Sequence, residues 1–125
     1  MNNDKLKSAV DSYKDFPKEG IVFRDVLPIL RDPQIFSDLI KEMSSSYLLR
    51  NSDAIIAIDA RGFIFASPIA NKLKKPLILA RKKNKLPGEL IQKSYGLEYG
   101  KDILTIQLSS IADYQKFVIV DDLLA

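Results

Sequence analysis

The segment "DAIIAIDARGFIFASPIANKLKKPLILARKK" constrains the fold of this chain more than any other segment. It opens with a continuous apolar run, Ala54–Ile58, which is typical of a strand covered by helices on both faces. Gly62–Lys74 has the length of a helix that ends before Pro76, and Leu77–Ala80 is a second buried strand. The order strand, turn, helix, strand predicts two parallel strands joined by a crossover helix.

Segments before this unit predict two helices and a loop. Asp32 is a candidate N-cap and Pro33 suits the first helical position, so a helix follows. Residues 3–14 predict a short amphipathic helix, and Asp15–Asp25 a loop with an extended exit. The apolar face of the helix after Asp32 comprises Ile35, Phe36, Leu39, Ile40, Met43 and Tyr47.

Two strands complete the predicted sheet. In Ile103–Leu108, Leu and Ile at 104, 106 and 108 alternate with Thr105 and Gln107, which is typical of a half-exposed strand. Phe117–Val120 is the last strand. The prediction is an α/β fold, one domain over residues 1–125, with a mainly parallel sheet flanked by helices and a ligand crevice at the carboxyl ends of its strands.

Composition limits the chemistry that is available. The chain has 125 residues, of which 46% are hydrophobic, so one globular domain is expected. Its 19 basic and 16 acidic residues give a net charge of +3, too small to predict nucleic-acid binding. It has no cysteine and no histidine, so catalysis must use carboxylates, cations, hydroxyls, backbone groups or a hard metal such as magnesium. The first 16 residues resemble neither a signal peptide nor a membrane span, which favours a cytoplasmic protein.

Charged residues follow each inner strand. "IDARGF" ends the first, "RKKNK" the second and "VDDLLA" the third. Between positions 72 and 85 there are seven basic residues and no acidic one, which indicates either a solvated face or a site for a polyanionic phosphate. Its position after a buried strand favours the phosphate site. Asp121 and Asp122 would then accept hydrogen bonds from sugar hydroxyls or bind magnesium, although a helix N-cap also explains such a pair.

Five motifs carry a resemblance to a known family. In chain order they are "DFPKEGIVFRD", "DARGFIFASPIA", "RKKNKLPGE", "SYGLEYG" and "VIVDDLLA". Together they resemble the adenine phosphoribosyltransferases, a type I phosphoribosyltransferase family of purine salvage. The resemblance covers about Asp15 to Ala125, nearly the whole chain. "VIVDDLLA" alone indicates only the wider superfamily, whereas "GIVFRD" together with "LEYG" indicates the adenine branch.

The resemblance implies an enzyme that joins adenine to the ribose of phosphoribosyl pyrophosphate, with magnesium present, and releases AMP and pyrophosphate. Arg61 would contact the pyrophosphate, and Asp121 and Asp122 would bind the ribose hydroxyls. No metal ligand of the protein itself can be assigned, and a homodimer is expected from the resemblance alone, without nucleic-acid or membrane partners. Further residues expected to bind phosphoribosyl pyrophosphate are Arg81, Lys82, Lys85, Tyr99 and Ala125.

The resemblance also assigns the residues that bind adenine and close over it. Backbone groups of Val22 and Arg24 would recognise the edge of adenine, Phe23 would form an apolar wall of the pocket, and Leu123 would close its other side. Glu98 would handle the proton at adenine N7. Residues 82–100 would form a mobile hood that excludes water.

One departure from the family pattern leaves alternatives open. Family members continue past "VDDLLA" into a Thr- and Gly-rich turn that holds the 5'-phosphate at a helix start, and that turn does not follow here. The expectation is a fragment with impaired activity. Two non-catalytic alternatives are a purine-sensing repressor on the same sheet and a degenerate protein that persists as an interaction partner.

Overall fold

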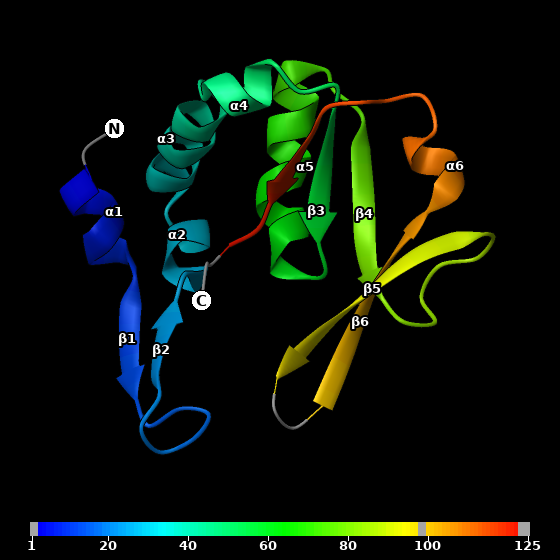
Figure 1. Cartoon of the computed structure of the whole chain (residues 1–125). Helices are drawn as coiled ribbons and strands as arrows, with labels where there is room; N and C mark the ends of the chain where they lie inside the picture. The colour runs from blue at the N-terminus through cyan, green and yellow to red at the C-terminus, as the bar shows by residue number, and fades with distance from the viewer. Residues whose placement is uncertain (1–2, 98–99, 123–125) are drawn as a thin grey trace. The chain divides into compact units, whose positions relative to one another are not determined.

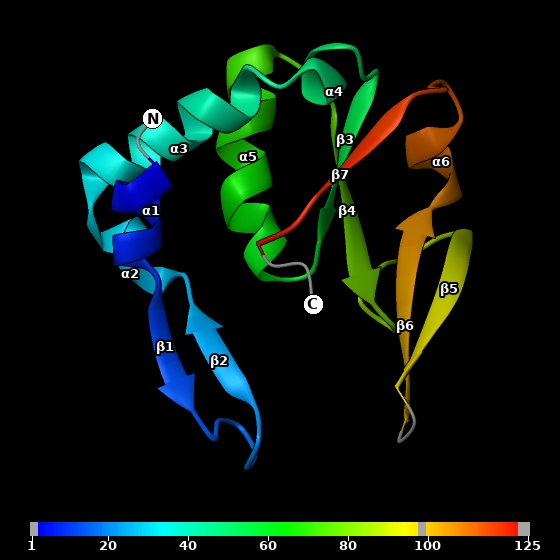
Figure 2. The same cartoon turned by 60° about the vertical axis from the view of Figure 1, so that its left-hand side comes forward.

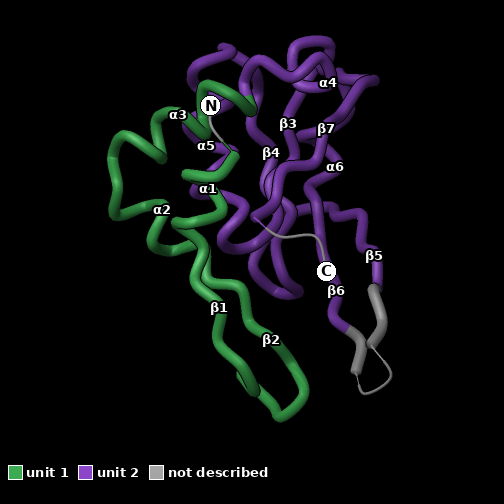
Figure 3. The backbone as a smooth tube through the Cα atoms, turned by 90° about the vertical axis from the view of Figure 1, so that its left-hand side faces the viewer, with its two compact units in different colours: residues 1–43 green, residues 44–125 purple. Residues whose placement is uncertain are grey.

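The computed structural model describes residues 3–97 and 100–122. The chain divides into two compact units, Met1–Met43 and Ser44–Ala125 (Figure 3). Elements of the N-terminal unit are α1 (Asn3–Ala9), β1 (Asp11–Lys14), β2 (Val22–Asp25), α2 (Leu27–Arg31) and α3 (Pro33–Ser44), whose last residue falls in the second unit. Those of the C-terminal unit are α4 (Tyr47–Arg50), β3 (Ala54–Ile58), α5 (Arg61–Leu73), β4 (Leu77–Lys82), β5 (Leu90–Leu97), β6 (Gly100–Gln107), α6 (Leu108–Ile111) and β7 (Phe117–Val120).

The N-terminal unit contains a β-hairpin where the sequence predicted a helix. The helix predicted over residues 3–14 ends at Ala9, and β1 pairs antiparallel with β2 (Figure 1). The connecting turn explains the difference: the Asp15 carboxylate accepts a 2.9 Å hydrogen bond from the Gly20 N–H, and Gly20 has a φ of +86°. That conformation suits glycine, so the turn favours the hairpin over continuation of the helix.

The helix predicted after Asp32 is confirmed, with one error. The Asp32 carboxylate accepts hydrogen bonds of 3.1 Å from the N–H groups of Gln34 and Ile35, as an N-cap does. The helix ends at Ser44, however, so Tyr47 does not belong to its apolar face; Tyr47 starts α4 and is 79% exposed. Three consecutive serines precede Tyr47, and serine side chains compete with helical backbone hydrogen bonds.

A five-stranded sheet forms the centre of the C-terminal unit (Figure 1, Figure 2). Its order is β5-β6-β4-β3-β7, in which β3 runs parallel to both β4 and β7. β6 is antiparallel to β4 and to β5, so an antiparallel hairpin extends the parallel part at one edge. The predicted α/β class is confirmed, and β3 and β7 have the predicted bounds.

Helix α5 contacts the three parallel strands β3, β4 and β7. The residues Phe65, Ala66, Ile69 and Ala70 of this helix are buried, as are Ile55 and Ala57 of β3.

Among the described residues, no helix has the length and apolar character needed to cross a membrane.

Three predicted features of the strands differ in the structure. β4 extends two residues further, to Lys82, and its Leu77 and Leu79 are partly exposed. Thr105, on the polar side of the predicted alternation, is only 1% exposed, because its hydroxyl donates a 2.9 Å hydrogen bond to the Arg81 carbonyl. Within the 82–100 segment, predicted as a hood loop, Leu90–Leu97 is strand β5. The mobility of that segment stays a prediction.

Candidate active site

The candidate site lies where the parallel strands end. Because β3, β4 and β7 run in the same direction, the residues that follow them meet at one edge of the sheet. A cavity of about 580 Å³ opens there. Its lining contains three carboxylates and two cations: the full set is Ile58, Asp59, Ala60, Arg61, Lys82, Leu104, Asp121 and Asp122.

An ion pair joins two of these segments. Helix α5 begins at Arg61, directly after the turn that leaves β3, and Asp122 follows β7. The Arg61 Nε lies 2.8 Å from the Asp122 Oδ2. The Arg61 side chain is 41% exposed and that of Asp122 only 7%, so the carboxylate is the desolvated partner. The pair therefore compensates a largely buried negative charge.

The neighbouring carboxylate, Asp121, has a different environment. Partial desolvation raises the pKa of the Asp121 carboxyl above 3.8, and the adjacent Asp122 carboxylate acts in the same direction. The backbone N–H of Asp122, which donates to Asp121 Oδ1 at 2.8 Å, and the Arg61 cation act in the opposite direction. Asp121 as a whole remains exposed, so it can reach a ligand in the cavity.

Gly62 allows the start of α5 to approach the end of β7. A Cβ atom at this position would lie 2.9 Å from the Val120 carbonyl oxygen and 3.0 Å from Asp121 Oδ1. Those distances are shorter than ordinary van der Waals contacts. A glycine is therefore required for the spacing that brings Arg61 and Asp122 together.

The sequence analysis did not assign Asp59 to the site. Its carboxylate, only 10% exposed, accepts a 3.3 Å hydrogen bond from the Lys82 N–H and pairs with Arg81 Nε at 3.4 Å. It thereby links the end of β3 to the end of β4. The available signal was an acidic residue at the carboxyl end of a predicted strand, two positions before Arg61.

The structure brings together four of the predicted site residues, Arg61, Lys82, Asp121 and Asp122, around the cavity. Arg81 is half-buried and contacts the cavity-lining Asp59. Lys85 is exposed, and its N–H donates to the Lys82 carbonyl at 3.3 Å in the turn beyond β4.

The predicted adenine-binding residues lie in the N-terminal unit, on β2. Val22 is 49% exposed, and the half-buried Phe23 packs edge to face against Phe16, with ring centroids 5.1 Å apart. Arg24 Nη1 donates to the Ser12 hydroxyl. The predicted residues Glu98, Tyr99, Leu123 and Ala125 lie outside the described residues.

The basic run between positions 72 and 85 is not one cluster. Lys72 and Lys74 lie at the end of α5, before β4 begins. The basic residues from Arg81 onward lie at the carboxyl end of β4 and beyond it, on the side of the candidate site. The four strand residues Leu77–Ala80, which span about 13 Å, lie between the two groups. Lys75 Nζ is bound to the backbone carbonyls of Arg50 (3.0 Å) and Ser52. Only the second half of the run is therefore placed to bind phosphate.

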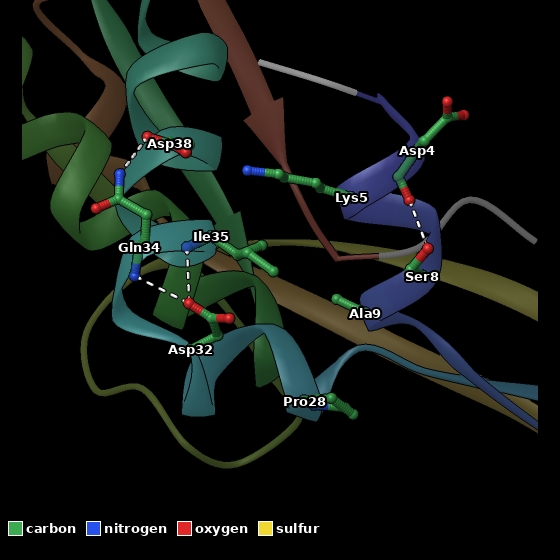
Figure 4. Close-up of a pocket in the computed structure, with 9 residues that line it drawn as sticks. All are labelled: Asp4, Lys5, Ser8, Ala9, Pro28, Asp32, Gln34, Ile35 and Asp38. Atoms are coloured by element: carbon green, nitrogen blue, oxygen red, sulfur yellow. Dashed lines mark hydrogen bonds between the residues drawn. The ribbon is translucent and has the colours of Figure 1, made fainter.

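A second cavity, of about 660 Å³, lies within the N-terminal unit between α1, α2 and α3 (Figure 4). Its polar groups are partnered locally: Asp32 caps α3, and Gln34 Nε2 donates to Asp38 Oδ1 at 2.9 Å. None of the predicted site residues lines it. The residues around it are Asp4, Lys5, Ser8, Ala9, Pro28, Asp32, Gln34, Ile35 and Asp38.

Among residues 3–97 and 100–122, no group of three acidic side chains is arranged to hold a metal ion. The carboxylates of the candidate site are engaged in pairs instead, Asp122 with Arg61 and Asp59 with Arg81. Oxygen atoms of Asp121 remain suitable in kind for a hard cation, but this set alone does not form a cage.

Comparison with known proteins decides the family. Residues 28–125 match the model of the phosphoribosyl transferase domain. The adenine phosphoribosyltransferase of Prochlorococcus marinus (strain MIT 9215) is 58% identical over all 125 residues, which span 73% of that protein. The chain belongs to the adenine phosphoribosyltransferase family.

Solved adenine phosphoribosyltransferases share its fold. The crystal structure of the enzyme from Thermoanaerobacter pseudethanolicus superposes with a TM-score of 0.91 at 40% identity, over 99% of this chain and 72% of that one. The enzyme from Saccharomyces cerevisiae, solved with adenine and an imino-altritol bisphosphate, gives 0.86 at 37% identity, over 95% of this chain and 70% of that one. The predicted resemblance, the type I fold and the assignment to a purine salvage enzyme family are confirmed.

Proposed function

We propose that this chain transfers the 5-phosphoribosyl group of phosphoribosyl pyrophosphate to adenine, giving AMP and pyrophosphate, with impaired activity in the 125-residue chain. One observation supports this most directly: a guanidinium, an ammonium and paired carboxylates line one cavity at the carboxyl edge of the parallel strands. A ligand that carries both phosphates and sugar hydroxyls matches that set, because cations neutralise phosphate and carboxylates accept from hydroxyls.

The site residues have distinct roles in this proposal. The bond between ribose C1 and the pyrophosphate oxygen breaks, and negative charge develops on the leaving group. Arg61 and Lys82 stabilise that charge, aided by Arg81 and Lys85. Asp121 and Asp122 accept hydrogen bonds from the ribose hydroxyls and act through their field on the cationic character of the ring.

The adenine-binding residues of this proposal are those that the family resemblance implies. Backbone groups of Val22 and Arg24 bind the edge of adenine, while Phe23 and Leu123 contact its faces. Adenine N9 forms the new bond to ribose C1 as the N7 proton passes to Glu98. The base therefore carries no extra positive charge once pyrophosphate has left. Tyr99 and Ala125 complete the contacts to phosphoribosyl pyrophosphate, and residues 82–100 close over the site to exclude water.

Magnesium, a homodimeric state and a cytoplasmic location are part of the same proposal. Magnesium would supply charge neutralisation for the pyrophosphate, and no protein ligand is assigned to it.

The test is an assay of the 125-residue chain with adenine, phosphoribosyl pyrophosphate and magnesium, in which AMP and pyrophosphate are both quantified. The Arg61→Gln variant should lose at least about a hundredfold in kcat/KM, the range found when one stabilising donor is removed. Lys72→Gln, at the far end of α5, is the matched control and should keep its activity. A wild-type chain that forms no AMP, or an Arg61→Gln variant as active as the wild type, would contradict the proposal.

A further inference from the structure

The ion pair between Arg61 and Asp122 means that the proposed pyrophosphate-binding guanidinium already contacts a carboxylate before any ligand binds. We propose that Asp122 acts as a specificity residue: its ion pair with Arg61 weakens the binding of anions that lack hydroxyl groups, but not the binding of ligands that carry hydroxyl groups beside their phosphates. This inference rests on the proposed function, and it adds a selection among the anions that could enter the site.

Burial of Asp122 provides the selectivity. Its side chain is 7% exposed, so a ligand that draws Arg61 away leaves a carboxylate that water solvates poorly. Fully deprotonated, magnesium-bound pyrophosphate offers that carboxylate no hydroxyl donor and must bear the full cost of separating the pair. A ribose pyrophosphate places hydroxyl donors beside its phosphates, so the carboxylate exchanges one partner for another.

The different solvent exposure of Asp121 and Asp122 distinguishes the proposed role of Asp122 from a general effect of negative charge in the cavity. Asp121 lines the same cavity and carries the same charge, but its carboxylate is only partly desolvated and the residue is exposed, so water solvates it better than the Asp122 carboxylate when an anion approaches. Removing either charge makes the cavity more positive by one unit. Only removal of Asp122 also takes away the 2.8 Å partner of Arg61.

The experiment is calorimetric titration of the 125-residue chain with inorganic pyrophosphate at fixed magnesium and ionic strength. Asp122→Asn should bind pyrophosphate about tenfold more tightly than the wild type, the scale of one charge-assisted hydrogen bond. Asp121→Asn, the control for charge, should change the affinity about twofold or less. In an Arg61→Gln background, Asp122→Asn should also change it about twofold or less, because the pair no longer exists.

Selectivity requires the opposite effect on the ribose ligand. The affinity for phosphoribosyl pyrophosphate should fall or stay level in Asp122→Asn, so the ratio of the two affinities moves by at least about tenfold. Asp122→Ser, with the charge removed by a smaller side chain, should show the same direction and guards against a folding defect particular to one variant.

Several outcomes would overturn the inference. An equal increase in pyrophosphate affinity in Asp122→Asn and Asp121→Asn would show that net charge alone explains the effect. Unchanged or weaker pyrophosphate binding in both Asp122 variants would show that Asp122 does not oppose the binding of this anion. Persistence of the full effect without Arg61 would show that the pair is not involved. The titration uses neither adenine nor turnover, so an inactive wild type with the expected binding pattern would refute only the proposed function.

Discussion

Substitution of Gly62 by alanine tests the close approach between α5 and β7. The added Cβ atom would lie 2.9 Å from the Val120 carbonyl oxygen, 3.0 Å from Asp121 Oδ1 and 3.2 Å from Asp121 Cα. Two of these three atoms belong to the backbone, so a side-chain rotation alone cannot relieve the contact. The start of the helix or the end of the strand must move by roughly 0.5 Å to restore ordinary contact distances.

The expected free-energy change combines two opposing effects. Overpacking of this kind costs about 1–3 kcal/mol, and the higher helix propensity of alanine recovers up to about 1 kcal/mol. The free energy of unfolding should therefore fall by about 1–2 kcal/mol. For a chain of 125 residues, this corresponds to a decrease in Tm of about 4–8 °C.

Thermal unfolding followed by circular dichroism measures this change, and the AMP-forming assay measures its effect on the site. Gly62→Val should lower the Tm further, whereas Lys72→Ala, at an exposed position of the same helix, should leave it within about 2 °C. Because either Arg61, at the start of the helix, or Asp121, after the strand, must shift, kcat/KM should fall in Gly62→Ala even well below its Tm. A Gly62→Ala variant as stable as the wild type would show that the backbone accommodates a Cβ and would refute the reasoning.

Two further predictions concern stability. The N–H groups of Gln115 and Lys116 lower the pKa of Asp53 below 3.8, so the stability it contributes is present above that pH and is lost as the pH falls through the lowered value. Asp53→Asn should therefore lower the Tm at pH 6, and the difference from the wild type should shrink towards pH 3; a constant difference in thermal melts would contradict this. Lys74 has a φ of +54° at the C-cap of α5, so Lys74→Gly should raise the Tm by about 2–4 °C, whereas Lys72→Gly, inside the last helical turn, should lower it.

The parallel core was predictable because its strands are short apolar runs with polar boundaries. Ala54–Ile58 and Phe117–Val120 are both bordered by charged residues, and the structure gives them the same bounds. Leu90–Leu97 was missed as a strand because its polar and apolar residues follow no clean alternation. Its pairing with β6 supplies the stability that its local sequence does not indicate.

The candidate site was predictable to the extent that its residues follow strands. Asp121 and Asp122 were found from their position at the end of an apolar run, whereas Arg61 was assigned through the family resemblance. Their mutual contacts were not, because a 2.8 Å ion pair between residues 61 positions apart depends on the spacing that Gly62 allows. The role of Asp59 also depends on a neighbour, the N–H of Lys82, which only the register of β3 against β4 brings within reach.

The parallel arrangement of β3, β4 and β7 has a consequence for how such a site can diversify. Each of the three strands places a site residue at or just beyond its own carboxyl end: Arg61 after β3, Lys82 as the last residue of β4 and Asp121 after β7. The strands themselves are fixed by backbone pairing and buried apolar side chains. Three short segments can thus be exchanged one at a time, so that a new sugar or leaving group is accommodated without rebuilding the scaffold.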